Sequence, residues 1–159
     1  MKTSKRVPFG VVTGLLSKME EIDFPISYTD GIKEIYFTYL KGSLHGDYCY
    51  NNKEVRISCS RRHREEMFKT FVHEVGHHID STEGFSDTDE LIEESKDERF
   101  HQFMEEDMLV PAGLDGEHGT CEYFAMGFEL FYSYDNGPRA LIKYPVLNDV
   151  ITKLHKRVK

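Results

Sequence analysis

The chain has 159 residues and a formal net charge of −8, with 39% hydrophobic and 30% charged residues. This size and composition fit one globular domain over residues 1–159 and exclude wholesale disorder. No apolar stretch reaches the roughly 20 residues that a membrane span needs, and the negative charge disfavours nucleic acid as a partner.

Residues 8–21 are predicted to form the first helix. Pro8 suits a first helical turn, and apolar residues recur on one face, at Val11, Val12, Leu15, Leu16 and Met19. Between Pro25 and Ser60 the pattern changes to short runs rich in β-branched and aromatic residues, at 34–39, 48–50 and 54–59, with turn signals between them. We expect a small sheet of about three strands there.

From Arg64 the period becomes helical, because apolar residues at spacings of three and four form a stripe: Phe68, Phe71, Val72, Val75 and Ile79. A helix over 86–107, a Gly- and Pro-containing loop over 110–119 and an apolar helix from Thr120 to about Tyr134 are expected to follow. A last helix, kinked or divided at Pro145, should reach the C-terminus. The order of helix, small sheet and further helices predicts an α+β domain.

Two histidines on the helix over 64–80 have the spacing of metal ligands. His73 and His77 lie four residues apart, so both imidazoles project from one helix face, one turn apart. In this relation they can occupy two of the four positions around a zinc ion. Glu74 lies about 100° round the helix from the first ligand, where it can act as general base towards a water that the metal activates. This combination is the HExxH motif of zinc peptidases.

A zinc site of this kind needs a third protein ligand, and several residues compete for that role. Glu122 is the best candidate, because it opens an apolar helix in which a carboxylate is costly unless paired or bound to metal. The alternative for Glu122 is stabilisation by the helix dipole alone. Cys121 has suitable chemistry but no supporting spacing. Asp80 is too near along the histidine helix to ligate, and we expect it to hold an imidazole N–H or a neighbouring helix, while Glu129 hydrogen-bonds a ligand histidine.

Small residues predict that the two helices of this site pack closely. Gly76 costs about 1 kcal/mol in a helix interior, and it would allow another chain segment to approach the metal beside His77. Ala125 and Gly127 would give the second helix the same freedom. His78 points away from the ligand pair and is interpreted as an ordinary polar residue.

The segment 71–80, FVHEVGHHID, resembles the active-site helix of the anthrax lethal factor family, which also contains the bacterial Pro-Pro endopeptidases. The segment 122–128, EYFAMGF, is similar to a helix of that family whose opening glutamate is the third zinc ligand. With the tail at 144–151, which looks like the closing helix of the family, the resemblance covers about residues 65–155. It implies a zincin-like metallopeptidase domain, with zinc held by His73, His77 and Glu122 and with Glu74 as general base.

The chain departs from this family at one position. Family members carry a tyrosine seven residues before the glutamate, which is credited with stabilising the oxyanion of the tetrahedral intermediate, and here that residue is Asp115. His118, four residues before Glu122, is the candidate substitute donor. Another tyrosine, brought in by a shifted loop, is the alternative.

The charge distribution and the cysteines bear on partners and compartment. Residues 83–107 carry eleven carboxylates against Lys96 and Arg99, a balance of −9. This stretch is interpreted as a solvated helix face, and the alternative is that it steers a basic peptide towards a cleft. Three cysteines without a CxxC pair, and no convincing signal peptide, favour a cytoplasmic protein, although an injected or unconventionally exported one would look the same.

Three functions fit these observations. The first is a zinc-dependent endopeptidase of lethal-factor type acting on a peptide or protein substrate, with proline near the cleaved bond as the family expectation. The second is an intracellular regulatory zincin that cleaves a repressor or partner protein, as in phages and mobile elements. The third is a zincin fold with weak catalysis that is kept as a binding module.

Overall fold

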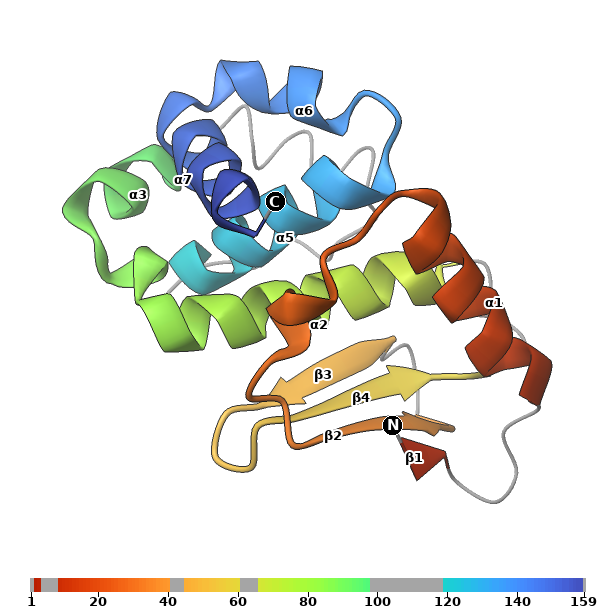
Figure 1. The fold of residues 1–159 in the computed structure, drawn as a ribbon. Coiled ribbons are helices and arrows are strands. Elements are labelled where there is room, and N and C mark those ends of the chain that lie inside the picture. The colour runs from red at the N-terminus through yellow and green to blue at the C-terminus, as the bar shows by residue number, and fades with distance from the viewer. Residues whose placement is uncertain (1, 4–8, 41–44, 61–65, 98–118, 159) are drawn as a thin grey trace.

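The computed structural model describes residues 2–3, 9–40, 45–60, 66–97 and 119–158, which form an α+β fold (Figure 1). None of the helices described is both long and apolar enough to cross a membrane. The elements, with η for 3-10 helices, are β1 (Lys2–Thr3), α1 (Phe9–Glu21), η1 (Ile26–Thr29), β2 (Glu34–Thr38), β3 (Gly46–Cys49), β4 (Glu54–Ser58), α2 (Met67–Glu83), η3 (Phe85–Asp87), α3 (Asp89–Glu94), α5 (Gly119–Ser133), α6 (Gly137–Ala140), η4 (Leu141–Lys143) and α7 (Pro145–Arg157).

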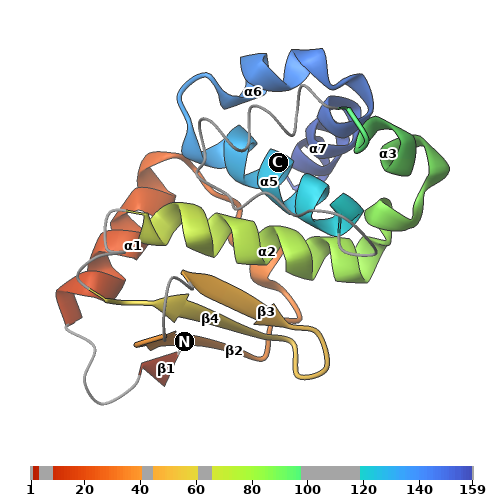
Figure 2. The same cartoon turned by 180° about the vertical axis from the view of Figure 1, so that it is seen from behind.

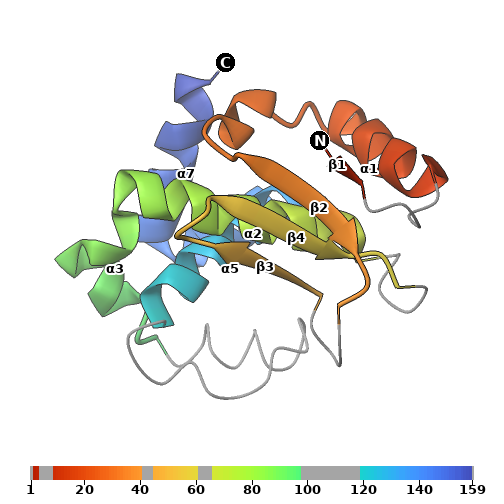
Figure 3. The same ribbon diagram turned by 90° about the horizontal axis from the view of Figure 1, so that it is seen from below.

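The strands form one mixed sheet with the order β1-β2-β4-β3. β1, β2 and β4 run parallel, and β3 runs antiparallel to β4 as the other arm of a hairpin. The three predicted strands are confirmed as β2, β3 and β4, and the two-residue β1 is an addition that the sequence pattern did not indicate. Val55 and Ile57 are fully buried while Arg56 between them is exposed, so one sheet face packs inwards. Figure 3 shows β1 and β3 at opposite edges, with α1 beside β1.

Helix α2 is the central layer of the molecule. It lies between the sheet on one side and α5 and α7 on the other, as Figures 1 and 2 show from opposite directions. Eleven of its 17 residues are buried, including the stripe residues Phe71, Val72, Val75 and Ile79. The predicted helix is therefore confirmed, and it is a buried helix with the histidine pair between two layers.

The backbones of α2 and α5 touch. A Cβ atom on Gly76 would lie 2.9 Å from Cα of Ala125, closer than real Cβ atoms come, and 3.3 Å from its carbonyl oxygen, which is a tight contact. The predicted close approach at Gly76 and Ala125 is thus confirmed. The interpretation of Gly127 was wrong, because its open side faces Leu147 of α7 and not α2.

An aromatic cluster fixes α2 and α5 relative to the N-terminal half. Phe24 makes edge-to-face contacts with its neighbours at centroid distances of 5.2–6.3 Å, and those neighbours are Tyr28, Phe71, Phe128 and Tyr132. The hydroxyls of Tyr28 and Tyr132 also share a buried 2.9 Å hydrogen bond. Such ring pairs contribute roughly 0.5–1.5 kcal/mol each beyond the area they bury, so they keep the two helices in register.

The predicted helix over 86–107 is confirmed only in part, because within its described residues the helix is α3, which covers Asp89–Glu94 and ends there. Ser95 turns its hydroxyl back to the carbonyl of Ile92, a local bond that competes with helix continuation. The side chain of Glu94 accepts hydrogen bonds from the backbone N–H groups of Val146 and Leu147, at 2.9 and 2.7 Å. Its carboxylate thus caps the start of α7, where the helix dipole favours negative charge.

Of the other C-terminal predictions, two fall on described residues and one lies almost entirely outside them. The helix from Thr120 is confirmed as α5, and the division of the last helix at Pro145 is confirmed by α6, η4 and α7. The predicted loop over 110–119 lies outside the described residues except for its last residue, Gly119, which opens α5.

Gly76→Ala should destabilise the fold although alanine favours helices. The new methyl group would meet the Ala125 backbone, and overpacking of this kind costs about 1–3 kcal/mol, against an intrinsic gain of about 1 kcal/mol. Chemical denaturation would measure the change in the free energy of unfolding. Gly14→Ala is the matched control, because nothing lies within 4 Å of its Cβ position in α1, and it should stabilise. A Gly76→Ala protein as stable as wild type would contradict the contact.

Candidate metal centre

The side chains of His73, His77 and Glu122 converge between α2 and α5. The two Nε2 atoms are 3.1 Å apart, and the Glu122 carboxylate lies 3.3 Å from Nε2 of His73 and 3.2 Å from Nε2 of His77. One potential ligand atom from each residue lies within 4.8 Å of the other two. The histidines project together because they are one turn apart on α2, and the carboxylate reaches them because α5 packs directly on α2 at Gly76.

Each histidine has a partner on its other ring nitrogen. Nδ1 of His73 lies 3.3 Å from Oε2 of Glu129, and Nδ1 of His77 lies 3.3 Å from the hydroxyl of Tyr50. An ionised carboxylate can only accept, so the His73 contact places a proton on Nδ1 and leaves Nε2 as the nitrogen that faces the centre. Outer partners of this kind orient metal-binding imidazoles, which is the geometry expected for Glu129.

The donor set fits a cation such as zinc. If both Nε2 atoms were unprotonated, two lone pairs and a carboxylate would point at one another, which is repulsive unless a cation or shared protons lie between them. Burial would lower the pKa of His73, but hydrogen bonding to Glu122 and Glu129 outweighs burial and raises that pKa to about 10. Burial raises the pKa of Glu122, and its contacts with His73 and His77 more than reverse this, to a value well below the usual range. Two histidines and a carboxylate are a common ligand set for zinc.

Glu74 is a buried carboxylate next to this cluster. It is 5% exposed, and burial raises its pKa to about 7, with His73 opposing and Glu122 reinforcing the shift. Gly46 of β3 makes room for it, because a Cβ there would lie 2.9 Å from Oε1 of Glu74 and 2.5 Å from a methyl carbon of Thr70. A carboxylate with a pKa near neutrality can accept and return a proton at physiological pH.

Asp80 and His78 have structural roles on the same helix. Both carboxylate oxygens of Asp80 accept hydrogen bonds from Ser86, one from the backbone N–H at 2.8 Å and one from the hydroxyl at 2.7 Å. Asp80 thus holds η3, which matches its expected role of holding a neighbouring helix. Among the hydrogen bonds of the described residues, none joins Asp80 to an imidazole N–H. His78 lies outside the candidate metal cluster, in line with its interpretation as an ordinary polar residue that points away from the ligand pair. It is nevertheless buried at 3% exposed, with Nδ1 2.9 Å from the Tyr48 hydroxyl and Nε2 2.8 Å from the Asp30 carbonyl.

Sequence reasoning missed Tyr50 and gave too little weight to Cys121. The Tyr50 hydroxyl and the Cys121 thiol lie within hydrogen-bonding reach of each other and of His77. The spacing of Tyr48 and Tyr50 by two residues in the predicted strand 48–50 was the available signal, because such residues share a strand face, although β3 ends at Cys49. His118, the candidate oxyanion donor, and Asp115 lie outside the described residues.

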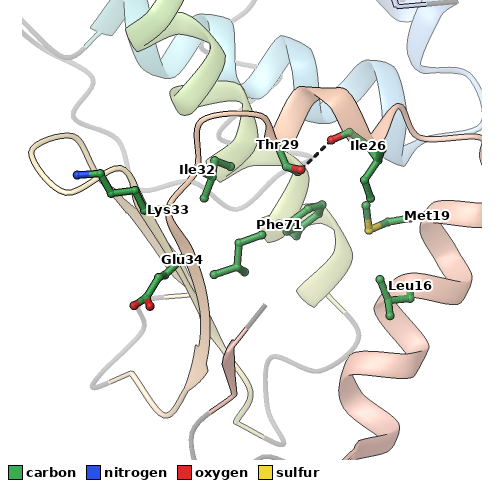
Figure 4. Close-up of a pocket in the computed structure, with 9 residues that line it drawn as sticks. Leu16, Met19, Ile26, Thr29, Ile32, Lys33, Glu34 and Phe71 are labelled. Atoms are coloured by element: carbon green, nitrogen blue, oxygen red, sulfur yellow. Dashed lines mark hydrogen bonds between the residues drawn. The ribbon is translucent and has the colours of Figure 1, made fainter.

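A cavity lies apart from the candidate metal centre. A cavity of about 220 Å³ opens between α1, η1 and β2, and none of the candidate site residues lines it (Figure 4). Its walls are largely apolar, with Lys33 and Glu34 as the charged exceptions. Phe71 reaches it from α2, from the opposite side to His73. It offers no cluster of ligating or proton-transferring groups.

We expect the purified protein to carry about one zinc ion per chain, measured by elemental analysis. Glu122→Ala and His77→Ala should each lose most of this zinc, because each removes one of three converging ligands. Glu90→Ala removes an exposed carboxylate from α3 and should keep wild-type zinc content. Full zinc content in Glu122→Ala would rule out Glu122 as the third ligand.

Zinc affinity should rise with pH. His73 has its pKa raised to about 10, so below that pH it holds a proton that a metal ion must displace. Affinity should therefore increase by up to about tenfold per pH unit for each proton released, between about pH 6 and pH 9. Competition against a chelator of known pH dependence would measure the slope, and a flat profile would show that no protonated ligand takes part.

The chain was also compared with protein-family models, with curated proteins and with solved structures, and none of the three comparisons gave a match. The chemical reading of the site therefore depends on its own geometry and charges. That geometry is a pair of imidazoles and a carboxylate on two touching helices, with a second carboxylate of near-neutral pKa beside them.

Proposed function

We propose that this chain is a zinc-dependent endopeptidase. The observation that carries the proposal is the meeting of His73, His77 and Glu122 from two helices, with Glu74 buried beside them. Three protein ligands around one ion leave a fourth position open, which is the arrangement of catalytic and not of structural zinc sites.

In this proposal the residues divide into two groups. His73, His77 and Glu122 hold the ion, and Glu129 and Tyr50 face the outer nitrogens of the two histidines. When bound, zinc supplies a Lewis acid that polarises the carbonyl of the scissile bond and lowers the pKa of water. Glu74 accepts a proton from the attacking water and delivers it to the leaving amine, and its near-neutral pKa suits both transfers.

A zincin-like fold and a relationship to the lethal factor family are part of the proposal. Both motifs that carry the resemblance lie on helices, residues 71–80 in α2 and residues 122–128 in α5. These helices meet where the resemblance requires a zinc site, with a mixed sheet on the other side of α2 (Figure 1). Proline near the cleaved bond is the corresponding expectation for the substrate.

Glu74 favours an enzyme over a binding module. A module that only held zinc would need the two histidines and Glu122. A further buried carboxylate beside them raises the electrostatic cost of folding, as its raised pKa shows. Retaining such a group is understandable when it transfers protons. A regulatory peptidase that cleaves one partner protein would use the same residues and differ only in substrate.

The test is hydrolysis of a peptide library rich in proline-containing sequences, followed by mass spectrometry, with zinc-loaded protein. Wild type should cleave a subset of peptides. Glu74→Gln should bind zinc as wild type does but lose about 10²–10⁴-fold in kcat/KM, the usual contribution of a general base. Glu20→Gln, at an exposed position of α1, should cleave normally.

Three outcomes would change the proposal. Equal cleavage by wild type and Glu74→Gln would remove Glu74 from the mechanism. Cleavage of a partner protein but of no short peptide would favour the regulatory peptidase. Zinc binding without hydrolysis of any peptide or protein substrate would favour the binding module.

A further inference from the structure

Two tyrosines near the end of β3 face two neighbouring histidines of α2. Tyr48 lies in β3 and Tyr50 is the first residue after it, and their rings pack edge to face with centroids 5.0 Å apart. The Tyr48 hydroxyl lies 2.9 Å from Nδ1 of His78. The Tyr50 hydroxyl lies 3.3 Å from Nδ1 of His77. Of these two histidines, only His77 belongs to the candidate metal centre.

The two hydrogen bonds have different directions. Nε2 of His78 faces the Asp30 carbonyl at 2.8 Å, and a carbonyl only accepts, so Nε2 carries the proton and Nδ1 accepts from Tyr48. His77 has the opposite arrangement, because its Nε2 faces His73 and Glu122 at 3.1 and 3.2 Å. A metal-binding Nε2 must be unprotonated, so the proton belongs on Nδ1. The N–H at Nδ1 of His77 then donates a hydrogen bond to the phenol oxygen of Tyr50.

We propose that Tyr50 is a positioning residue that fixes the tautomer and ring orientation of His77 and thereby raises the affinity of the centre for zinc. The inference rests on the proposed zinc centre and adds a residue that neither the motif nor the resemblance contains. Tyr50 does for His77 what Glu129 does for His73, whose Nδ1 lies 3.3 Å from that carboxylate.

Exposure shows why Tyr50 is suited to this role. Its side chain is half exposed at 50%, whereas His77 is 6% exposed, and the centroids of the two rings are 6.3 Å apart. The phenol of Tyr50 therefore contacts solvent, whereas the ligand histidine is shielded from it. Because a water molecule could replace part of its hydrogen bond, the loss of the hydroxyl should weaken zinc binding without abolishing it. Losing an outer partner of a ligand typically lowers metal affinity about 10–100-fold.

The experiment compares Tyr50→Phe with Tyr48→Phe. Each removes one phenol oxygen, from β3 or from the residue directly after it, next to Nδ1 of a histidine on α2. Zinc affinity is measured by competition with a chromophoric chelator, and stability by denaturation without zinc. Tyr50→Phe should bind zinc about 10–100-fold more weakly with an unchanged denaturation midpoint. Tyr48→Phe should keep wild-type zinc affinity but unfold at lower denaturant, because it leaves the buried Nδ1 of His78 without a donor.

Cobalt substitution gives a readout that a purely structural role would not move. The visible absorption of bound Co²⁺ depends on ligand geometry, so its band positions or intensities should change in Tyr50→Phe and stay as wild type in Tyr48→Phe.

The proposal would be overturned if Tyr50→Phe had the zinc affinity and the cobalt spectrum of wild type. That result would leave the metal centre intact, with the Cys121 thiol as the acceptor for His77. Equal loss of affinity in both variants would overturn it in favour of general packing by β3. If wild type bound no zinc, the metal centre and the role of Tyr50 would both fall.

Discussion

The backbone contact between Gly76 of α2 and Ala125 of α5 is the constraint on which the candidate metal centre depends. Helices that pack through ordinary side chains keep their axes about 8–10 Å apart. Here even a Cβ would lie 2.9 Å from the opposing Cα. His77 follows Gly76 directly, and Glu122 precedes Ala125 by three residues, about one helical turn. The close approach is therefore what allows a carboxylate of one helix to reach the imidazoles of the other.

This contact gathers polar groups that an interior would otherwise exclude. Glu74, His77 and Glu129 are all at most 8% exposed, and buried polar networks are stable only when their members satisfy one another. His73 lies between two carboxylates, which reverse the effect of burial on its pKa. Burial, opposed by His73 and reinforced by Glu122, leaves Glu74 with a pKa near neutrality. Mutual compensation thus stabilises the histidine and its carboxylate partners, while the raised pKa of Glu74 suits the proton transfer proposed for it.

Strand β3 connects the sheet to the same centre. Gly46 and Tyr48, two residues apart on β3, meet Glu74 and His78, and Tyr50, directly after the strand, meets His77. The sheet does more than cover an apolar helix face, because its edge strand contacts the proposed base and leads directly to the tyrosine that contacts a proposed ligand. A change of register in the β3–β4 hairpin would move all three contacts together.

The sequence by itself determined the α+β order of elements, the histidine pair on one helix face, and Glu122 and Glu129 as carboxylates that need partners. These follow from local rules, since spacing of three, four or two residues sets which side chains share a face. It misjudged Gly127 and did not indicate the burial of His78, because both depend on which distant segment packs against them. It also made α3 too long, because the local hydrogen bond from Ser95 to Ile92 competes with the helix. Only the tertiary structure decided that Tyr50 reaches His77, that Asp80 holds Ser86, and that Glu94 caps α7. Contacts between residues far apart in the chain leave no periodic trace in the sequence, because they depend on how layers stack after the local elements have formed.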